Sequence, residues 1–377
     1  MRLLVQPGEG TTSLVKAING ARKTVELSLF RFDRREIERA LQGAVERGVF
    51  VHALVAHTNR GGEKKLRKLE MRLLAVGVSV ARTGEDLVRY HDKVMIVDRR
   101  VLYVLGFNLT SLDIDRSRSF GIVTEERRLV QEAVKLFEAD AKRQEYKPEH
   151  EGFVVSPVNA RQQLERFIKG AKRSLLIYDL SITDPAMIRA LLERAKAGVE
   201  IRVIGQVIRR GVKCEVRRLA SLRLHTRTII RDGTAAFVGS QSLRALELDV
   251  RREVGIIFRD AEVVSSLTKI FEGDWKSGLQ VDEKRKAAAD APQLTEAPVA
   301  CAPDAPKEVA KAVAGDLASI STALEKSLKR AVTEEASIHV DSATVEQAVQ
   351  QALKGAVKQA VREVMEQGVE PKAPEET

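Results

Sequence analysis

The chain has 377 residues, of which 44% are hydrophobic, and a formal net charge of +10 at pH 7. This length leaves room for two domains and a tail, and the hydrophobic content is sufficient for packed cores. The lack of any apolar run of about 18 residues argues against a transmembrane helix, and two cysteines exclude a disulfide framework. Because the first residues also lack the apolar segment of a signal peptide, we expect a cytoplasmic protein.

The first half of the sequence alternates between strand-like and helix-like segments. A short apolar run ends at Pro7, and a helical pattern follows over 13–23. A buried strand is expected over 24–30, a helix ending at glycine over 36–48, and a further strand over 49–55. Strands that alternate with helices predict an α/β fold with βαβ units and a mixed, mostly parallel sheet flanked by helices.

The second half repeats this order 150 residues later. The Gly-Ala-basic-basic sequence at 20–23 recurs at 170–173. Further along, matching residues are 134 apart, so the first half holds 16 extra residues within 57–90. A repeat of this length indicates duplicated domains rather than a solenoid of small units. We predict a first lobe over 1–148 and a second lobe over 149–281.

The composition changes from about residue 282. The segment 282–306 is rich in Ala and Pro and predicts a linker. Apolar residues at helical spacing over 307–368 predict a helical tail, either a hairpin or a coiled-coil element, that would mediate self-association or bind a protein partner. The last residues, 369–377, are expected to be disordered.

One short histidine pattern occurs at corresponding places in both halves. Each copy has a histidine, one residue, a cation, four residues and an aspartate, and the two sets are His91, Lys93 and Asp98, then His225, Arg227 and Asp232. Alternate side chains of a strand share a face, so we expect each histidine and its cation to project into one pocket. A single copy would be weak evidence, whereas two copies in register within a duplication are strong evidence.

Two histidines that share a pocket suit phosphoryl transfer. A neutral imidazole is a nucleophile near pH 7, and its attack on phosphorus would give a covalent phosphohistidine. The second histidine would protonate the leaving alkoxide, while Lys93 and Arg227 would stabilise charge on the phosphoryl oxygens. Neutral donors to the same phosphate would come from Asn108, Ser240 and Ser242. This chemistry requires no metal and no other cofactor, and no metal-ligand cluster is evident in the sequence.

The two aspartates of the repeated pattern have a different expected role. Asp98 and Asp232 lie five residues after the cation and end their strands. We expect both to hold the following turn rather than to take part in the chemistry.

At these residues the chain resembles the phospholipase D superfamily, including its cardiolipin-synthase-like members, over about residues 1–275. The family pattern is HxKxxxxD followed by a GSxN turn, twice, with an acidic residue 11 positions after the Asn. The second half keeps Ser240, has Ser242 in place of the Asn, and supplies the acidic residue as Glu253. The first half keeps Asn108 but has Gly106 in place of the turn serine and Ser119 in place of the acidic residue.

The resemblance implies two lobes related by a pseudo-twofold axis, with both histidines in one cleft. It also implies that His91 is the nucleophile and that His225 is the general acid. Family members often pair across the halves, so Glu253 would orient His91. Ser119 would then leave His225 without a carboxylate.

The leading functional hypothesis is an enzyme that hydrolyses or transfers phospholipid phosphodiesters, peripheral at the membrane. Residues 285–377 are net acidic, so the preceding part carries more than the whole net charge of +10, and such a basic body favours anionic partners. A nuclease is the alternative: an aromatic content of 4% argues against base stacking but not against contacts to the phosphate backbone. A third hypothesis is a catalytically weak binding protein, suggested by Arg227, Gly106 and Ser119.

Overall fold

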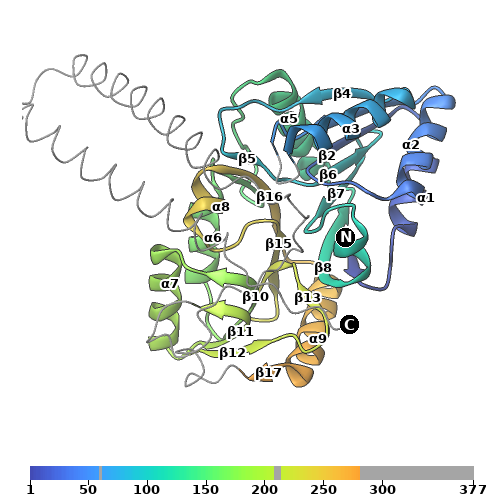
Figure 1. Cartoon of the computed structure of the whole chain (residues 1–377). Coiled ribbons are helices and arrows are strands. Elements are labelled where there is room, and N and C mark those ends of the chain that lie inside the picture. Colours follow the sequence, from blue (N-terminus) through green and yellow to red (C-terminus); the bar gives the residue numbers. More distant parts are fainter. Residues whose placement is uncertain (59–61, 208–213, 281–377) are drawn as a thin grey trace, which may run out of the picture. The chain divides into compact units, whose positions relative to one another are not determined.

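The computed structural model describes residues 1–58, 62–207 and 214–280. They belong to one compact unit that spans Met1–Glu283 (Figure 1). The predicted linker, helical tail and C-terminal end, 282–377, lie outside the described residues. Among the helices that the structure describes, none has the length and apolar character needed to cross a bilayer.

The elements of the first lobe are, in chain order, β1 (Arg2–Gln6), α1 (Thr12–Gly20), β2 (Thr24–Leu29), α2 (Arg35–Glu46), β3 (Phe50–Val55), α3 (Gly62–Ala75), β4 (Ser79–Arg82), β5 (Arg89–Tyr90), β6 (Val94–Val97), β7 (Val101–Leu105), α4 (Ser111–Asp115), β8 (Ser117–Thr124) and α5 (Arg127–Lys142). Those of the second lobe are β9 (Phe153–Ser156), α6 (Ala160–Lys169), β10 (Ser174–Ile182), α7 (Pro185–Lys196), β11 (Glu200–Val207), β12 (Glu215–Arg218), β13 (Arg223–Leu224), β14 (Arg227–Arg231), β15 (Ala235–Gly239), α8 (Ala245–Asp249), β16 (Arg251–Phe258), α9 (Ala261–Ser277) and β17 (Leu279–Gln280). The extra residues of the first half thus include helix α3.

Each lobe is built on one mixed sheet. The first has the order β1-β8-β7-β6-β2-β3-β4, and the second has β17-β12-β11-β10-β14-β15-β16, with β9 also pairing β16. The βαβ units make β2, β3 and β4 parallel, and likewise β10, β11 and β12. The prediction of mostly parallel sheets is wrong outside these units. There β6, β7 and β8, like β14, β15 and β16, pair antiparallel, because their connections are too short for the crossover that parallel pairing requires.

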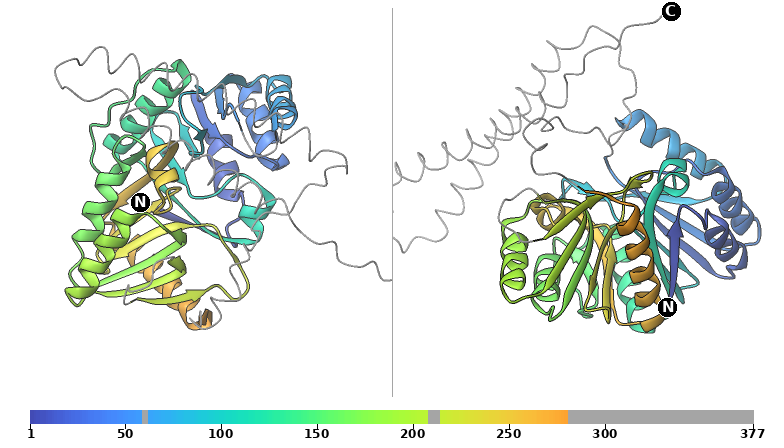
Figure 2. Two further views of the ribbon diagram at one scale, coloured as in Figure 1. Left: turned by 60° about the vertical axis from the view of Figure 1, so that its left-hand side comes forward. Right: turned by 90° about the horizontal axis from the view of Figure 1, so that it is seen from below.

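The two lobes share one hydrophobic core. Helices α5 and α9 and the central strands of both sheets contribute to it, with Phe137, Phe271 and Trp275 among its buried aromatic residues. The opposite face of the first sheet packs against α1, α2 and α3, and that of the second sheet packs against α6 and α7. Figure 2 shows the lobes side by side, with the orange helix α9 next to the N-terminal strand β1.

Equivalent contacts cross between the lobes in both directions. Strand β5 of the first lobe pairs with β16, and β13 of the second lobe pairs with β8. Arg118 Nε lies 2.7 Å from Asp274, and Arg252 Nη2 lies 2.9 Å from Asp140. The two arginines, Arg118 and Arg252, are 134 residues apart, and so are the two aspartates, Asp140 and Asp274. The crossing is therefore symmetric, as a pseudo-twofold relation between the lobes requires.

Candidate active site

The two motif histidines are held by the backbone of the opposite lobe. His91 donates its N–H to the carbonyl of Arg252 at 2.8 Å, and His225 donates to the carbonyl of Arg118 at 3.1 Å. The expectation that each histidine lies within a strand is wrong, since β6 begins at Val94 and β14 begins after His225. The short strands β5 and β13, each paired with a strand of the other lobe, end just before His91 and His225. Both histidines therefore lie where the two sheets meet.

His91 lies in a buried cluster with one carboxylate and one ammonium. Its Nδ1 is 2.9 and 3.0 Å from the two carboxylate oxygens of Glu253, so the contact expected across the halves is present. Lys93 Nζ lies 3.1 Å from the same Nδ1 and donates to the His91 carbonyl. The ring of Phe30 packs edge-on against the imidazole at 4.5 Å. These contacts fix the ring, with Nδ1 toward the carboxylate and Nε2 away from it.

His225 has different partners. Its Nε2 lies 3.5 Å from Asp113 Oδ2, and its Nδ1 is buried without a hydrogen-bond partner among the described residues. Ser119 occupies the position equivalent to Glu253, and its buried hydroxyl also has no hydrogen-bond partner in this part of the chain. Arg227 donates from Nη1 to the His225 carbonyl at 2.6 Å and reaches Ser242 Oγ at 3.4 Å. The two histidines therefore sit in unequal surroundings.

Two carboxylates that sequence reasoning missed hold the turns after β7 and β15. Asp113 Oδ2 accepts from the backbone N–H of Asn108 at 2.8 Å and from its side-chain amide at 2.7 Å. Glu247 Oε2 accepts from the backbone N–H of Ser242 at 2.6 Å. Each carboxylate follows its turn residue by five positions, and the two are 134 apart. The repeat spacing would have identified them as a matched pair.

The turn residues themselves differ between the halves. A Cβ atom on Gly106 would lie 2.7 Å from the Phe120 carbonyl oxygen and 3.2 Å from that of Gly239 in the other lobe. This close approach explains why serine is absent there. The Ser240 hydroxyl accepts from the Val254 N–H at 3.2 Å and hydrogen-bonds the Glu253 carboxylate. In this structure Ser240 supports that carboxylate, and its role as a phosphate donor stays a prediction.

Burial shapes the protonation of the first cluster. It lowers the pKa of His91 well below the ordinary value, and the neighbouring cations Lys93 and Arg227 lower it further. Burial also raises the pKa of Glu253 to about 8, helped by repulsion from Glu247, and lowers the pKa of Lys93 to about 8. Near pH 8, therefore, the buried carboxylate gains its charge and the ammonium begins to lose its own.

The two motifs act on each other electrostatically. Arg227 of the second lobe lowers the pKa of His91, and Lys93 of the first lobe lowers that of His225, after burial as the main cause in both cases. His91 remains 8% exposed and His225 6% exposed. The motifs thus form one nearly buried cationic site, to which both lobes contribute a histidine and a cation.

The motif aspartates lie outside this cluster and bind backbone. Asp98 accepts from the N–H groups of residues 22–24 at 2.6–3.1 Å, and Asp232 accepts from those of residues 172–174 over the same range. Both have a positive φ, 52° and 56°. They tie the chain before β2 and β10 to the end of the motif strands, as a structural role requires.

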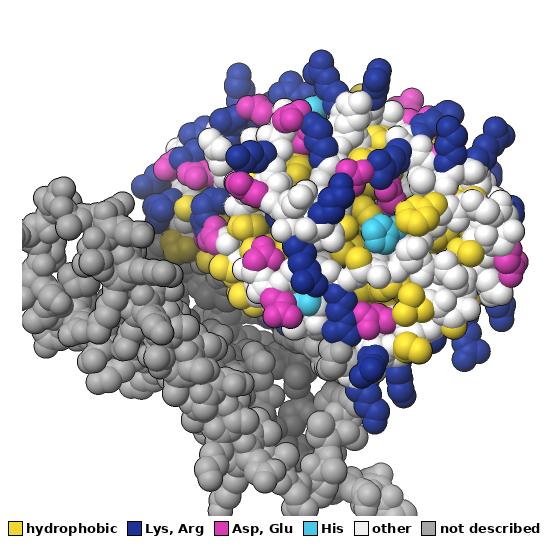
Figure 3. Space-filling view, turned by 90° about the horizontal axis from the view of Figure 1, so that it is seen from above, with side chains coloured by type: hydrophobic (Ala, Val, Ile, Leu, Met, Phe, Trp, Pro, Cys, Tyr) yellow, Lys and Arg dark blue, Asp and Glu magenta, His cyan; other side chains and the backbone are white. Residues whose placement is uncertain are grey.

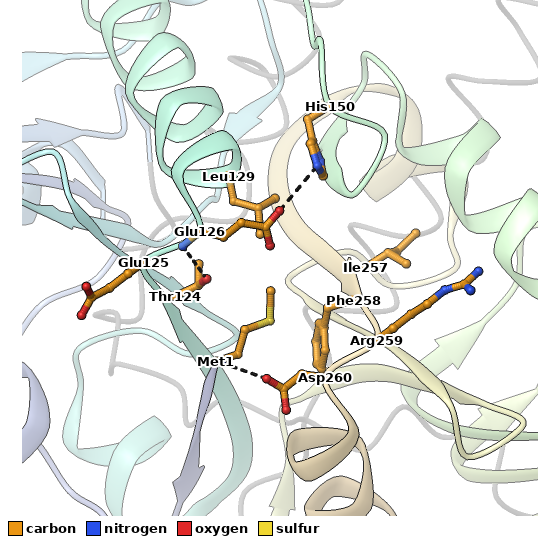
Figure 4. A pocket seen from close by; sticks show the side chains of 10 residues that line it. All are labelled: Met1, Thr124, Glu125, Glu126, Leu129, His150, Ile257, Phe258, Arg259 and Asp260. Carbon is orange, nitrogen blue, oxygen red and sulfur yellow. Dashed lines mark hydrogen bonds and ion pairs between the residues drawn. The ribbon is translucent and has the colours of Figure 1, made fainter.

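A separate cavity of about 650 Å³ lies between the lobes and is lined by none of the predicted site residues (Figure 4). Its lining includes Glu126 and His150, whose carboxylate oxygen and Nε2 are 3.8 Å apart, and Asp260, which pairs with the amino group of Met1 at 2.9 Å. Among the described residues, no group of three or more His, Cys, Asp or Glu side chains is arranged to hold a metal ion.

The model of the family described as "Cardiolipin synthase, PLD-like domain" matches residues 14–141 and 164–275. Both matched stretches contain one histidine motif. The chain belongs to the phospholipase D superfamily. This membership agrees with the duplicated α/β lobes and with the resemblance seen in the sequence.

The curated relatives of this phospholipase D-like chain match only part of it. The mitochondrial cardiolipin hydrolase of Canis lupus familiaris is 31% identical over 131 residues, which cover 34% of this chain and 48% of the relative. The human protein of the same name is 31% identical over 131 residues, with 34% and 49% covered. A probable phospholipase D of Caenorhabditis elegans is 26% identical over 140 residues, with 32% and 25% covered. The chain thus spans about half the length of the cardiolipin hydrolases.

Solved structures confirm the fold over both lobes. Polyphosphate kinase from Porphyromonas gingivalis superposes with a TM-score of 0.61 at 18% identity, over 73% of this chain and 50% of the kinase. Phosphatidylserine synthase from Haemophilus influenzae superposes with a TM-score of 0.55 at 12% identity, over 73% of this chain and 85% of the synthase. At these identities the likeness shows the fold alone.

Proposed function

We propose that this protein is a phosphodiesterase or phosphatidyltransferase that acts on phospholipid phosphodiesters through a covalent phosphohistidine, without a metal. The observation that carries the proposal is the contact of His91 Nδ1 with the buried Glu253 carboxylate of the other lobe, at 2.9 Å. With Nδ1 donating to the carboxylate, the lone pair of Nε2 is free to attack phosphorus. Among the described residues no equivalent carboxylate faces Nδ1 of His225, which favours His91 as the nucleophile and His225 as the acid.

The reaction then has two displacements. Nε2 of His91 forms a bond to phosphorus while the bond to the leaving oxygen breaks, and His225 gives its proton to that oxygen. Water or another alcohol next attacks phosphorus, gives its proton to His225, and breaks the bond between phosphorus and His91. Lys93 and Arg227 stabilise the charge on the phosphoryl oxygens throughout. Ser242, which Arg227 reaches at 3.4 Å, and Asn108 on the equivalent turn add neutral donors.

Three observations support a lipid substrate. The matching family model is described as "Cardiolipin synthase, PLD-like domain", and relatives are named mitochondrial cardiolipin hydrolases. Lys and Arg side chains are spread over the face seen in Figure 3, with Asp and Glu between them, which suits contact with an anionic surface. This charge supports a peripheral position at a membrane, and we propose that the protein works there from the cytoplasm.

The same positive charge is the observation that favours the second candidate, a nuclease. A net charge of +10 attracts a nucleic-acid backbone as well as a lipid head group. The two candidates share the site and the chemistry and differ only in what is attached to the phosphate.

A substrate panel tests the proposal. The full chain is incubated with phosphatidylcholine vesicles, phosphatidylglycerol vesicles, plasmid and a labelled oligonucleotide, with and without a chelator, and His91→Asn is the control. We expect a lipid product that is unaffected by chelation and absent with the variant. Nicked plasmid or a cut oligonucleotide without a lipid product would establish the nuclease, and no turnover of any phosphodiester would establish the weak binding protein.

A further inference from the structure

Both lobes contribute the same histidine motif to the site, but only one histidine has a carboxylate beside its Nδ1. Glu253 faces His91, whereas its counterpart Ser119 is an uncharged residue with an unpartnered, buried hydroxyl among the described residues. His225 Nδ1 is likewise buried and unpartnered in that part of the chain. A histidine that must hold and release a proton therefore lacks the carboxylate that the other histidine has.

A different carboxylate reaches this histidine. Asp113, on the short helix α4, is 3% exposed and lies 3.5 Å from His225 Nε2. Its Oδ2 accepts two hydrogen bonds from Asn108, and its Oδ1 accepts one from Arg223. Four contacts to one carboxylate fix its position, and the donors keep it ionised. Although burial alone would raise it, the pKa of Asp113 is lowered by His225, Arg223 and Asn108.

We propose that Asp113 is a positioning residue that replaces the missing partner of His225, holding the imidazole in place and favouring its protonated, proton-donating form. This inference rests on the proposed function, in which His225 is the general acid. The separation of 3.5 Å is an ion-pair distance and longer than a good hydrogen bond. The proton on Nε2 is thus attracted by Asp113 but still free to pass to the leaving oxygen.

The charges around His225 make this contact decisive. Arg227 at the start of β14, Arg223 on β13 and Lys93 before β6 all disfavour the imidazolium, in addition to burial. Asp113, on α4, is the anion that opposes them. Ser119 on β8 contributes no charge. Burial already holds the pKa of His225 well below its ordinary value, and without Asp113 the imidazole would face three cations and its pKa would fall further.

Glu247 provides a matched control. It binds the turn of Ser242 as Asp113 binds the turn of Asn108, and it pairs with Arg244 and Arg251. It makes no hydrogen bond or ion pair with either histidine that the described residues show. Glu247→Gln therefore reports the loss of a turn carboxylate whose charge acts on His91 and Glu253, which both substrates need alike. Asp113→Asn reports the loss of a turn carboxylate together with the contact to His225.

The test compares two phosphodiesters that differ in their leaving group. An alkyl alcohol needs a proton to leave, whereas p-nitrophenolate does not, so only the alkyl diester depends on the acid. We expect Asp113→Asn to lower kcat on the alkyl diester roughly tenfold or more beyond its effect on the nitrophenyl diester, a part of the range typical of general acids. Glu247→Gln should change both substrates alike. Equal losses with Asp113→Asn would overturn the inference.

A second variant covers the case in which Asp113→Asn does not fold. Ser119→Glu, in an otherwise unchanged chain, places a carboxylate at the position equivalent to Glu253, toward the unpartnered Nδ1. A new anion raises the pKa of His225, so turnover of the alkyl diester should persist to higher pH; an unchanged pH profile would count against the inference. Activity of His91→Asn on the nitrophenyl diester would refute the proposed function itself, whichever result Asp113 gives.

Discussion

Replacing Glu253 by glutamine isolates the charge of one buried carboxylate. The Glu253 side chain is fully buried, and both of its oxygens lie within 3.0 Å of His91 Nδ1. The glutamine carbonyl can still accept the Nδ1 hydrogen, so the ring keeps its orientation and only the negative charge is lost. A hydrogen bond to a charged group contributes about 1.5–3 kcal/mol and one between neutral groups about 0.5–1.5 kcal/mol, so the lost charge is worth about 1–1.5 kcal/mol. At about 1.4 kcal/mol per tenfold in rate, kcat should fall roughly 5- to 12-fold.

The assay is release of p-nitrophenolate from bis(p-nitrophenyl) phosphate near pH 8, where the wild-type carboxylate begins to ionise. Thermal unfolding is followed in parallel. Because its pKa in the folded protein is raised, Glu253 contributes stability below its ordinary pKa and loses that contribution as the pH rises through about 8. Glutamine cannot ionise, so the variant should gain stability relative to wild type as the pH rises through about 8. Its turnover should nevertheless be lower than that of wild type.

Glu26→Gln is the control for this experiment. Glu26 is also buried, on β2, but its partner is Arg99 at 2.7 Å and it takes no part in the histidine cluster. This variant should unfold more easily and keep its kcat. The reasoning would be refuted by full turnover of Glu253→Gln near pH 8, or by an equal loss of turnover in Glu26→Gln.

Three further predictions concern the cations and the structural aspartates. As the pH rises through about 8, Glu253 gains its charge while Lys93 loses its proton, so turnover should pass through a maximum near pH 8; Lys93→Arg, which stays charged, should remove the decline on the alkaline side in a pH–rate profile. Arg227→Lys should retain part of the activity, and a rate independent of position 227 in steady-state assays would contradict its phosphate role. Asp98→Ala should lower stability by about 1–3 kcal/mol in urea titrations, because it leaves backbone N–H groups without their acceptor.

The duplication made much of this site predictable. Residue spacing placed His91 and His225 at equivalent positions, and the family pattern assigned Glu253 to His91 across the halves, where the structure has it. The first two strands of each parallel unit, β2 and β3, then β10 and β11, were also predicted, since a helix ending at glycine separates them; the third strands, β4 and β12, were not. The antiparallel direction of β7 and β8 was not, because an apolar run of this length does not reveal which neighbour it will pair with.

Other features depended on contacts that sequence spacing does not encode. Strand β5 pairs with β16 of the other lobe and ends at Tyr90. His91 therefore lies between β5 and β6 rather than within β6. Asp113 and Glu247 accept hydrogen bonds from backbone N–H groups. Every residue except proline has such a group, so the sequence does not reveal which one a carboxylate will bind. Gly106 could be noticed as a departure, but its causes, the nearby carbonyls of Phe120 and of Gly239 in the other lobe, are contacts of the folded chain.

The exchange of β5 and β13 between the sheets has a consequence for any half-chain fragment. Cut between the lobes, each fragment would carry a histidine whose backbone acceptor had left with the other piece. Such a fragment could complete its sheet only by associating with a second molecule, and its activity would then vary with concentration. Joining both halves in one polypeptide fixes their stoichiometry, so the site forms even at high dilution.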